Sequence, residues 1–597
     1  MIESLMPWYE RELHTLWKEC QLFSKNHPQL AKYLSFSHGR VDDPHAARTM
    51  EAFALLNARL SRQLATDSNK MTVALLQLLF PVSMQSLPSV SIIRIPPTKK
   101  QSGFGTLPKN TRFWVYNDDQ RYCQFHTTRN IDLCPFDIVS CHMEQRPFNQ
   151  NDMDYSPSDK MLLNLKITMM DDTLTFSDCG DFSTLTVQLS GLFRLQILLY
   201  DILNKDLSGI ILSTPEGGHL SLPVTCFSPV GFDDECIMRT NPSHLLDHQK
   251  MFELFAWPEL FFGFELKEIG RWLKHCQSNR VTLTFCLSSH CDELMQNIGL
   301  VQFLLGCAPI INVFEHIAEP ITIDHKQLNY PVIPDVASNN TMEVQDIVDI
   351  VDITRTEPET LPNLFGLCHN EKGNNKFWVY RPSDNESEEF GHLEIIYTEL
   401  DPYSRQVMVL SPHVLCNNGN QVLDLPDNPK LECIDSVTIP DPDKVSLLLK
   451  PTATVKRSGD IKAWLNLFAY LHNSILTILE SSEPVRQLRH VINLYTIRNH
   501  AASNAWLSSI QNMTVKNQVA TLKINGQRCF TQGSEIIFEL DPAQLANTST
   551  MMFTNLLDYI AAHFVGFNSY IQVVIKLKGS EEEYIRCTRH HGYQMNR

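Results

Sequence analysis

The sequence lacks an excess of positive charge, which bounds the partners it can have. Its 597 residues carry 50 Lys and Arg against 67 Asp and Glu, a formal net charge of −17. A protein that follows a nucleic-acid backbone needs a basic surface to displace counterions, and an anionic membrane attracts basic segments. The bulk charge therefore argues against a nucleic-acid partner and against binding to a membrane surface.

Long hydrophobic runs are also missing. The most apolar run, Val73 to Phe80, ends at Pro81, whereas a membrane-spanning helix takes about 20 residues. The segment Met1 to Trp8 contains Glu3 but no Lys or Arg, so it has no positively charged start of a secretory signal. We therefore expect a soluble, cytoplasmic chain with no direct membrane insertion.

Local signatures of catalysis are absent as well. The 16 cysteines are scattered without a CxxC pair, which is typical of reduced, buried thiols in a cytoplasmic protein. There is no phosphate-binding Walker A sequence and no GxSxG serine motif, and Gly103-Phe104-Gly105 lacks the third glycine of a dinucleotide fingerprint. We predict that the protein is not an enzyme and has no catalytic residues, no metal and no cofactor.

One group of side chains could hold zinc in principle. His275, Cys276, Cys286, His290 and Cys291 lie within 17 residues, and thiolates with imidazoles are the ligands of tetrahedral zinc. The group has neither CxxC nor HxxxH spacing, and Cys286 falls in a strand-like run. A packed core is the favoured interpretation, with a metal site as the alternative.

Two other spacings also have simpler interpretations. His244 and His248 form an HxxxH pair, but no glutamate follows the first histidine as it does in zinc proteases. Asp346, Asp349 and Asp352 stand three residues apart, separated by Ile and Val that favour a strand. On a strand such a period alternates between the two faces, so a solvated, aggregation-resistant edge is favoured over a cation site.

Apolar periodicity predicts a helical bundle segment over residues 1–89. Steps of three and four residues on one helix face connect Leu5, Tyr9, Leu13, Leu16, Cys20 and Phe23. A second helix should begin with Asp43 as N-cap and Pro44 at its first position, and a third should cover 69–80. The second helix has an apolar face made by Met50, Phe53, Leu60 and Leu64.

Aromatic residues surround the first of these stripes. Tyr9 lies on the stripe, and Trp8 and Trp17 lie beside it. They could fill the protein's own core, but a wide stripe on a helix of about five turns favours contacts on more than one side. Aromatic residues also dominate protein interfaces. The predicted protein-interface residues are Trp8, Tyr9, Leu13, Leu16 and Trp17.

Beyond the helices the sequence predicts an α+β, multidomain protein, with about three to five domains at ~150 residues each. We expect β-rich domains over 90–330, with inserted helices such as 192–203, and over 331–450, followed by a mixed α/β domain over 451–597. The clearest strand-like runs are Val90 to Ile95, Arg112 to Tyr116, Leu162 to Met169 and Val281 to Leu287. In the last domain, Trp464 to Ile478 and a segment from Pro484 should be helical.

The opening segment, Met6-Pro7-Trp8-Tyr9-Glu10-Arg11-Glu12-Leu13, resembles the start of the TssF family, also called VasA or ImpG. The most specific block of the resemblance is Cys307 to Glu315, followed by Ala318-Glu319-Pro320. Where the family has a small residue or glycine, this sequence has Asn110. Where it has CTNR, this sequence has Leu415 to Asn418, so the arginine and its role do not carry over.

The resemblance implies a baseplate subunit of the bacterial type VI secretion system, similar to wedge proteins of contractile phage tails. It implies that two copies of TssF pair with one TssG in a wedge that also carries TssK and TssE. Wedges would then surround the VgrG spike and initiate sheath and tube assembly. Such a protein has no catalytic activity and no cofactor. The family-motif residues expected to be structural are Pro309, Asn312, Phe314, Glu319 and Pro320.

Two alternatives to a structural subunit stay open at this point. One is a soluble adaptor that binds secreted effectors and forms a simple binary complex. The other is an uncharacterised metalloenzyme that uses Cys286 and His290. A scaffold differs from both because it predicts a stoichiometric assembly with several neighbours.

Overall fold

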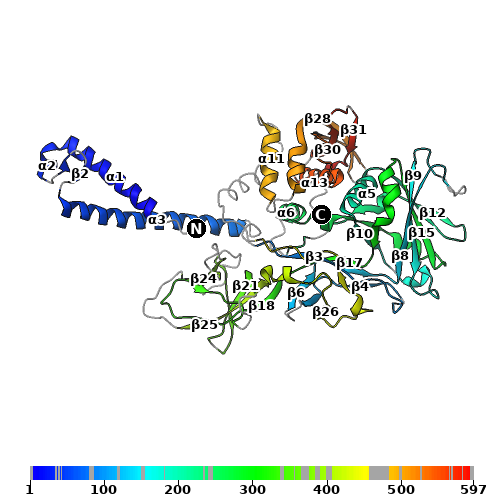
Figure 1. Cartoon of the computed structure of the whole chain (residues 1–597), viewed down its shortest axis with the longest axis horizontal. Coiled ribbons are helices and arrows are strands. Elements are labelled where there is room, and N and C mark those ends of the chain that lie inside the picture. The colour runs from blue at the N-terminus through cyan, green and yellow to red at the C-terminus, as the bar shows by residue number, and fades with distance from the viewer. Residues whose placement is uncertain are drawn as a thin grey trace.

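The structure is a computed structural model. It describes residues 5–33, 36–37, 40–41, 43–79, 86–101, 103–116, 122–148, 155–180, 182–232, 236–238, 246–336, 342–354, 356–364, 375–382, 390–397, 407–455, 483–496, 501–524, 527–563, 565, 569–580 and 582–591. The helical stripe predicted for 464–478 lies outside these residues. The chain folds into a β-rich body from which a helical hairpin projects (Figure 1).

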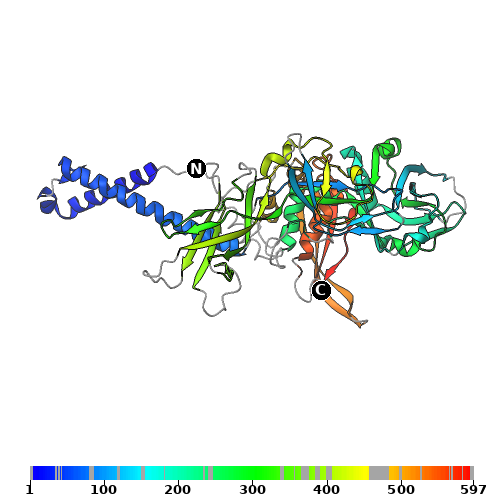
Figure 2. The ribbon, with the colours of Figure 1, turned by 90° about the horizontal axis from the view of Figure 1, so that it is seen from below.

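The projecting hairpin is built from the N-terminal helices. Helix α1 (Leu5–Asn26) packs along α3 (Pro44–Leu79), and a short turn region links them. That region consists of α2 (Pro28–Tyr33), β1 (Phe36–Ser37) and β2 (Arg40–Val41). Figures 1 and 2 both place the hairpin outside the body, with its tip far from the C-terminal elements.

The start of α3 is as predicted, but its length is not. The backbone N–H of His45 donates to Asp43 Oδ1 at 3.0 Å, so Asp43 caps a helix whose first residue is Pro44. The expectation of separate second and third helices is wrong, because α3 runs unbroken to Leu79. Its interior contains neither proline nor glycine, and polar residues such as those at 66–69 lower helix propensity without breaking the helix.

The centre of the body is a six-stranded antiparallel sheet. Its strands in spatial order are β26 (Leu431–Cys433), β5 (Arg112–Tyr116), β6 (Tyr122–Thr127), β17 (Cys307–Ile311), β3 (Val90–Arg94) and β27 (Ser446–Leu447). Strands β4 (Gly105–Leu107) and β7 (Ile131–Leu133) precede and follow β5 and β6 in the sequence, and they pair with each other in a separate two-stranded sheet. Residues far apart in the sequence therefore share this sheet.

Two further antiparallel sheets complete the body at the end opposite the hairpin (Figure 1). The first contains β12 (His219–Leu222), β11 (Leu207–Ser213), β15 (Arg280–Leu287), β9 (Met161–Met169) and β8 (Phe136–Gln145). The second contains β13 (Phe227–Pro229), β14 (Gly263–Lys267), β10 (Thr184–Gly191) and β16 (Val301–Leu304). The clearest strand-like runs of the sequence thus form strands.

A separate β unit lies below the central sheet in Figure 1. Its larger sheet contains β18 (Phe314–Ile317), β25 (Met408–Asn417), β21 (Glu343–Asp352), β22 (Glu359–Leu361) and β19 (Ile321–Ile323). Its smaller sheet contains β20 (Tyr330–Pro331), β24 (His392–Tyr397) and β23 (Lys376–Arg381). We call these eight strands the lower β unit, and it has a hydrophobic core of its own.

The C-terminal elements form a mixed sheet. It contains β28 (Ile510–Ile524), β29 (Gln527–Leu540), β30 (Ser569–Leu577), β31 (Glu583–Arg586) and β32 (His590–His591). Strands β29 and β30 are parallel and are connected through a helix, α13 (Thr550–His563), whereas the other pairings are antiparallel. This is the mixed α/β character expected of the C-terminal segment.

The remaining helices cover these sheets. The α-helices are α5 (Phe193–Lys205), α6 (Leu246–Ala256), α7 (Ile269–Leu273), α8 (Asp292–Asn297), α11 (Pro484–Tyr495) and α12 (Ala501–Ser509). Short 3-10 helices cover Phe176–Cys179, Val224–Cys226, Pro258–Phe261, Ile298–Leu300, Gly419–Asp424 and Pro442–Lys444. Helices α5 and α11 confirm the two helices predicted from Leu192 and from Pro484.

One hydrophobic core joins the body to the C-terminal elements. It runs from Leu87 through α5 and α6 to α13 and Ile575. Aromatic contacts cross it, and the rings of Phe255 and Trp506 lie 5.9 Å apart. The boundaries at 89/90, 330/331 and 450/451 stay predictions. Strands β26 and β27, from the segment predicted as the 331–450 domain, pair with β5 and β3 of the segment predicted as the 90–330 domain.

Candidate protein-interface surfaces

The α1–α3 hairpin is held together by a seam of large residues against small ones. The stripe of α1, which includes Tyr9, Leu13 and Leu16, is half-buried. Among the residues of α3 whose side chains the structure describes, the buried ones are Ala54 and Ala58, which have no exposed surface. Small side chains at these positions allow two helices to approach closely, so the predicted α1 stripe does pack inside the chain.

A polar contact fixes the register of this seam. The hydroxyl of Ser61 on α3 donates to Glu12 Oε1 on α1 at 3.1 Å. Neighbouring side chains on α1 also interact, because the Arg11 guanidinium lies over the Trp8 ring at 4.5 Å from its centroid. Trp8 is half-buried, whereas Trp17 is 45% exposed.

A second apolar stripe on α3 has no cover from the described residues. Phe53, Leu56, Leu60 and Leu64 follow one another at steps of three, four and four, and each is 55–62% exposed. They point away from the seam residues Ala54 and Ala58, because side chains so spaced share one helix face. We call these four residues the α3 stripe. Contiguous apolar surface of this kind marks interaction sites.

The α3 stripe changes which residues are the main interface candidates. The interface role predicted for Trp8, Tyr9, Leu13, Leu16 and Trp17 stays a prediction, and of these Trp17 is the exposed one. The sequence showed Phe53, Leu60 and Leu64 as an apolar face, but periodicity cannot tell a face that packs within the chain from one left open. Leu56 was not recognised, although it completes the same spacing.

A second candidate region lies where the central sheet meets the lower β unit. The chain leaves β17 at Ile311 and enters β18 at Phe314, so Asn312 stands at the crossing. Its side-chain Nδ2 donates to Gln124 O and to Asn418 Oδ1, both at 2.8 Å. In return the backbone N–H of Asn418 donates to Asn312 Oδ1 at 2.7 Å.

This amide network is fully enclosed. Asn312 has no exposed surface and Asn418 is 3% exposed, and Asn418 Oδ1 also accepts from the backbone N–H of Gln124 at 3.1 Å. Buried polar groups are stable only when their hydrogen bonds are made. Asn418 follows the end of β25, so the two asparagines tie strands of two different sheets together.

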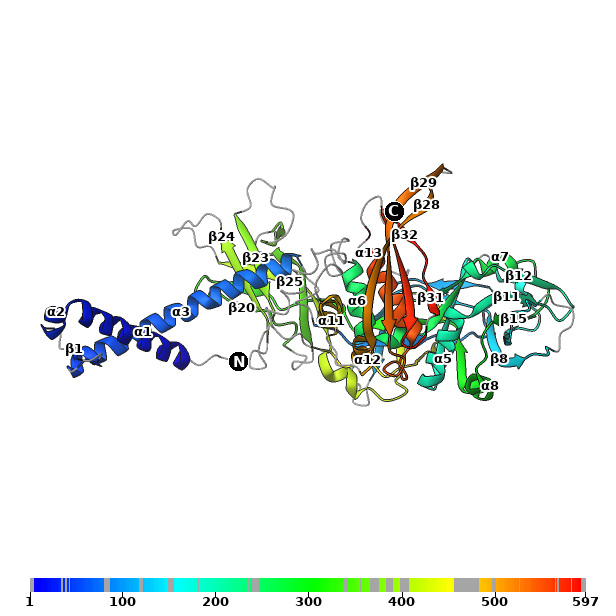
Figure 3. The ribbon, with the colours of Figure 1, turned by 90° about the horizontal axis from the view of Figure 1, so that it is seen from above.

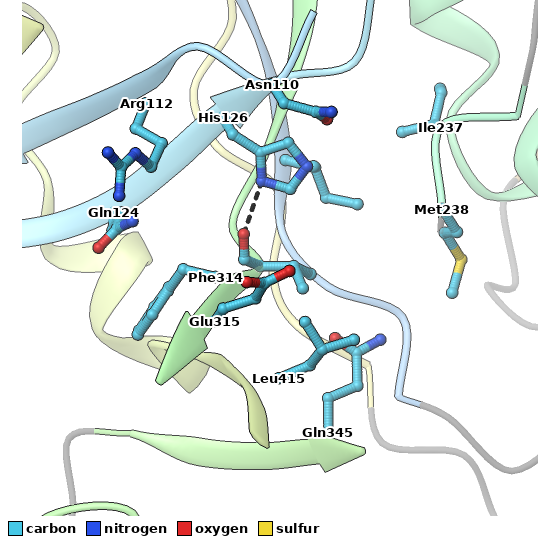
Figure 4. Close-up of a pocket in the computed structure, with 12 residues that line it drawn as sticks. Asn110, Arg112, Gln124, His126, Ile237, Met238, Phe314, Glu315, Gln345 and Leu415 are labelled. Atoms are coloured by element: carbon cyan, nitrogen blue, oxygen red, sulfur yellow. Dashed lines mark hydrogen bonds between the residues drawn. The ribbon is translucent and has the colours of Figure 1, made fainter. Parts of the chain in front are cut away.

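A cavity of about 320 Å³ lies beside this network (Figure 4). It is lined by Asn110, Arg112, Gln124, His126, Ile237, Met238, Ile311, Val313, Phe314, Glu315, Gln345 and Leu415. The His126 ring Nδ1 lies 2.6 Å from Val313 O, so the imidazole is fixed to the backbone between the two sheets. The cavity combines amide, guanidinium, imidazole and carboxylate groups with an apolar wall.

Two residues of this wall have restricted geometry. The Arg112 guanidinium donates to Asp435 Oδ1 through Nε at 3.0 Å and Nη2 at 2.7 Å, and these bonds raise the pKa of Arg112. Asn110 has a φ of 66°, in the left-handed region that suits glycine and asparagine. That conformation explains why a glycine-like position of the family accepts Asn110.

The other family-motif residues lie in β17, in β18 and in the connection between β18 and β19. Pro309 is in β17 next to β3, and its carbonyl accepts from the backbone N–H and the hydroxyl of Thr128, both at 3.0 Å. Phe314 is buried in the core of the lower β unit. Glu319 and Pro320 connect β18 to β19, and the Glu319 N–H donates to Ile333 O at 3.0 Å. Their structural role stays a prediction.

The residues considered for zinc occupy separate environments. Cys286 packs against Leu162 and Ile211, and burial raises the pKa of its thiol to about 12. His290 Nε2 lies 2.7 Å from Asp292 Oδ1 on the surface. Over the part of the chain that the structure describes, no three His, Cys, Asp or Glu side chains are grouped so that they could hold a metal ion.

The other two candidate spacings resolve differently. His244 lies outside the described residues, and of His248 only the backbone, in α6, is described. Asp346, Asp349 and Asp352 are on β21, which confirms the predicted strand. Asp349 Oδ1 is 2.7 Å from His413 Nδ1 on β25.

None of the helices within the described ranges is both long and apolar enough to span a membrane.

The fold is that of a type VI secretion baseplate component. A chain in the solved structure of a type VI secretion TssK–TssF–TssG baseplate subcomplex superposes with a TM-score of 0.70, at 19% identity, over 91% of this chain and 99% of that one. A second structure, of the type VI secretion baseplate complex, gives a TM-score of 0.57 at 17% identity, over 98% and 99% of the two chains.

The sequence places the chain within a family. The family model described as "Type VI secretion system, TssF" matches residues 1–594, and the chain belongs to this TssF family. It is 22% identical over 626 aligned positions to the type VI secretion system component TssF1 of Pseudomonas aeruginosa strain PAO1, an alignment that covers 99% of both chains. The resemblance seen in the sequence is thereby confirmed.

Proposed function

We propose that this chain is a structural subunit of the type VI secretion baseplate wedge. In this role it assembles with TssG, TssK, TssE and a second copy of itself around the VgrG spike, and it helps to initiate sheath and tube assembly. Family membership supports the role, as does the presence of TssK and TssG in the solved subcomplex that shares the fold. Such a subunit works from the cytoplasm without transforming a substrate.

The observation that carries this proposal is the α3 stripe. Four large apolar side chains, each more than half exposed, lie on a hairpin that projects from the body. A third and fourth helix laid along the stripe would turn the hairpin into a bundle and remove this surface from water, at about 25 cal/mol per Å² of apolar area. Helices of TssG and of a second copy are the proposed occupants.

A co-purification experiment tests this assignment. Leu56→Asp together with Leu60→Asp should abolish co-purification with TssG, because two carboxylates would be desolvated in the bundle. Arg59→Asp is the matched control, since it adds the same side chain on another face of α3 and should leave binding intact. Circular dichroism of both variants would show that the body stays folded.

The choice of variants matters here. Leu13 and Leu16 would be less informative positions, because their half-burial in the seam means that Asp there would also open the hairpin itself. If the Leu56/Leu60 variant co-purified with TssG as well as the control did, the α3 stripe would not be the assembly surface. A binary complex with an effector and no multisubunit assembly would instead support an adaptor.

A further inference from the structure

The cavity at the junction of the central sheet and the lower β unit has the size of a site for one side chain. Its volume of about 320 Å³ lies at the lower end of the range for ligand sites, about 300–1,000 Å³. Two of the lining residues, Arg112 and Glu315, are exposed, so the cavity opens to solvent. Figure 3 places the lower β unit between the tip of the hairpin and the C-terminal sheet, so this opening lies away from the tip.

One side of the cavity is a histidine whose tautomer is fixed. His126 Nδ1 lies 2.6 Å from Val313 O, and a carbonyl oxygen can only accept, so Nδ1 carries the proton. The other ring nitrogen, Nε2, is then an acceptor in the neutral imidazole. Figure 4 shows Nε2 turned away from Val313 and toward the side of the cavity where Ile237 lies. The imidazole therefore offers the cavity an acceptor.

A buried glutamine supplies a second acceptor. Gln345 is 9% exposed, and its Nε2 donates to Ser86 O at 3.1 Å, which fixes the orientation of the amide. Its Oε1 is buried, and no residue within the described ranges gives it a hydrogen bond. Buried polar atoms nearly always have a hydrogen-bond partner. An oxygen left without one on a residue that lines a cavity therefore points to a ligand that donates.

The charges around the cavity favour a cation. Glu315 contributes a carboxylate to the wall. Arg112, the one Lys or Arg among the lining residues, donates to Asp435 through Nε and Nη2, so its charge is compensated. Strand β21, which carries Gln345, contains four Asp and Glu and no Lys or Arg. A cleft with one predominant sign of charge concentrates ligands of the opposite sign.

The facing wall is apolar. Ile237 and Met238 lie across the cavity from the three acceptor residues (Figure 4). Long basic side chains bury their methylene groups along apolar surface while the charged head reaches polar groups. Guanidinium is planar and has five N–H donors in a fixed fork, whereas ammonium is a compact point charge. Acceptors that come from three separate strands, β6, β18 and β21, therefore suit guanidinium better.

We propose that this cavity binds the guanidinium of an arginine side chain presented by a partner protein. His126 Nε2, Gln345 Oε1 and the Glu315 carboxylate accept its N–H groups, while Ile237 and Met238 cover its methylene groups. Because the lining belongs to both the central sheet and the lower β unit, the bound side chain also holds these two parts together. The proposal does not rest on the α3 stripe or on the wedge role.

The lining itself favours an arginine within a chain over free arginine. Free arginine carries an α-carboxylate, which needs a cation or several N–H donors. Arg112 is already bound to Asp435, and the lining residues include no Lys and no other Arg. An arginine residue in a peptide has no such carboxylate, so only its side chain has to be recognised.

A peptide titration of the full-length chain tests the site. The probe is the tripeptide glycine–arginine–glycine, blocked at both ends and followed by saturation-transfer NMR, and the same peptide with citrulline is the neutral comparison. The arginine peptide should bind with a dissociation constant on the order of 1 mM, as expected of one anchored side chain. The citrulline peptide should bind at least about tenfold more weakly. Equal binding of the two peptides, or no binding of either, would overturn the proposal.

Substitutions of Glu315 show whether the peptide binds in the cavity. Glu315→Gln keeps the size of the side chain and removes its charge, so binding should weaken about tenfold. Glu315→Lys places an ammonium in the cavity and should abolish binding. Glu359→Gln, at an exposed position of β22 in the same β unit, is the matched control and should bind as the wild type does. Full binding by Glu315→Lys would rule out this cavity.

Three further measurements separate the site from a change of fold and from other ligands. Gln345→Met removes the acceptor on β21 and should weaken binding as well, so the result does not depend on Glu315 alone. Leu56→Asp with Leu60→Asp should leave peptide binding unchanged, because the α3 stripe is another surface. Agmatine, a guanidinium without a peptide backbone, tests for a free small molecule. If it bound about tenfold more tightly than the peptide, a protein partner would be excluded.

Discussion

Asp201 on α5 caps the amino end of α13 through Ser549. The Asp201 carboxylate accepts hydrogen bonds from the Ser549 hydroxyl and, at 3.1 Å each, from the backbone N–H groups of Thr550 and Met551. These residues are almost 350 positions apart in the chain, and α13 connects the parallel strands β29 and β30. The cap therefore fastens the C-terminal sheet to the body.

Removing this cap should loosen the C-terminal elements. Asp201→Ala leaves the first N–H groups of α13 without their acceptor, and loss of a capping side chain costs about 1–2 kcal/mol. The expected result is a lower unfolding midpoint in urea, with faster hydrogen exchange in α13. Asp206→Ala, five positions further on at the C-terminal end of α5, is the control. Unchanged exchange in α13 would contradict the capping role.

The same carboxyl predicts a pH dependence. Burial raises the pKa of Asp201 to about 6, above its ordinary value of 3.8, although its hydrogen bonds lower it. The folded state then binds more protons than the unfolded state between these values, so stability should fall as pH rises through about 6. Comparing the unfolding midpoint of the wild type with that of Asp201→Asn at about pH 4.5 and about pH 7 isolates this effect. A difference that grew in favour of the wild type at the higher pH would refute it.

A histidine at the end of the chain should respond in the same direction for another reason. The pKa of His590 is raised by its hydrogen bond to Asp558 on α13, where Nε2 lies 2.7 Å from Oδ2. The stabilisation from the charged pair is fully present below the unfolded pKa of about 6.5 and is lost as pH rises through the higher folded value. The protection of the backbone N–H groups of Tyr570 and Ile571, which pair with β32, should therefore fall at alkaline pH relative to the intrinsic exchange rate, which base itself accelerates. His590→Gln should remove that fall in protection.

The asparagine network predicts an energetic coupling between two sheets. Asn312→Ala and Asn418→Ala should each cost about 1–3 kcal/mol, because each leaves buried partners without hydrogen bonds. The double variant should cost less than their sum, with a coupling of about 0.5–3 kcal/mol in a double-mutant cycle. The experiment measures the free energy of unfolding of the wild type, of both single variants and of the double variant. Additive costs would show that the two side chains act independently.

The seam of the hairpin predicts sensitivity to added volume. Ala58→Leu should separate α1 from α3, because overpacking a tight contact costs about 1–3 kcal/mol. Ala52→Leu is the matched control, since Ala52 is exposed on the same helix. Limited proteolysis should cleave α1 faster in the first variant only. Equal cleavage of both variants would mean that the seam tolerates the extra side chain.

Features set by neighbouring residues could be predicted from the sequence, and features set by distant residues could not. Asp43 and Pro44 define the start of α3 because a cap and a first-turn proline act locally. The prediction of a separate third helix over 69–80 failed, because the polar residues that precede it lower helix propensity without ending the helix. The hydrogen bond between Asn312 and Asn418 joins residues 106 positions apart. The sequence around either residue gives no sign that the other is its partner.

The interface surfaces show the same limit. Spacing located the apolar residues of α1 and α3, yet only the fold separated the half-buried Leu13 from the exposed Leu60. Strand β29 begins at Gln527, and its first half could not be predicted. This half is polar with isolated apolar residues, so it has no core-facing alternation that a sequence pattern could reveal.

The unbroken course of α3 has a mechanical consequence. At 1.5 Å per residue its 36 residues make a rod of about 54 Å. With no proline or glycine inside it, the rod cannot fold at a joint, so it behaves as a lever. A tilt of about 5° at the body would swing the tip by about 5 Å, roughly one helical turn. A partner bound at the tip would therefore be displaced by several ångströms when the body rotates by a few degrees.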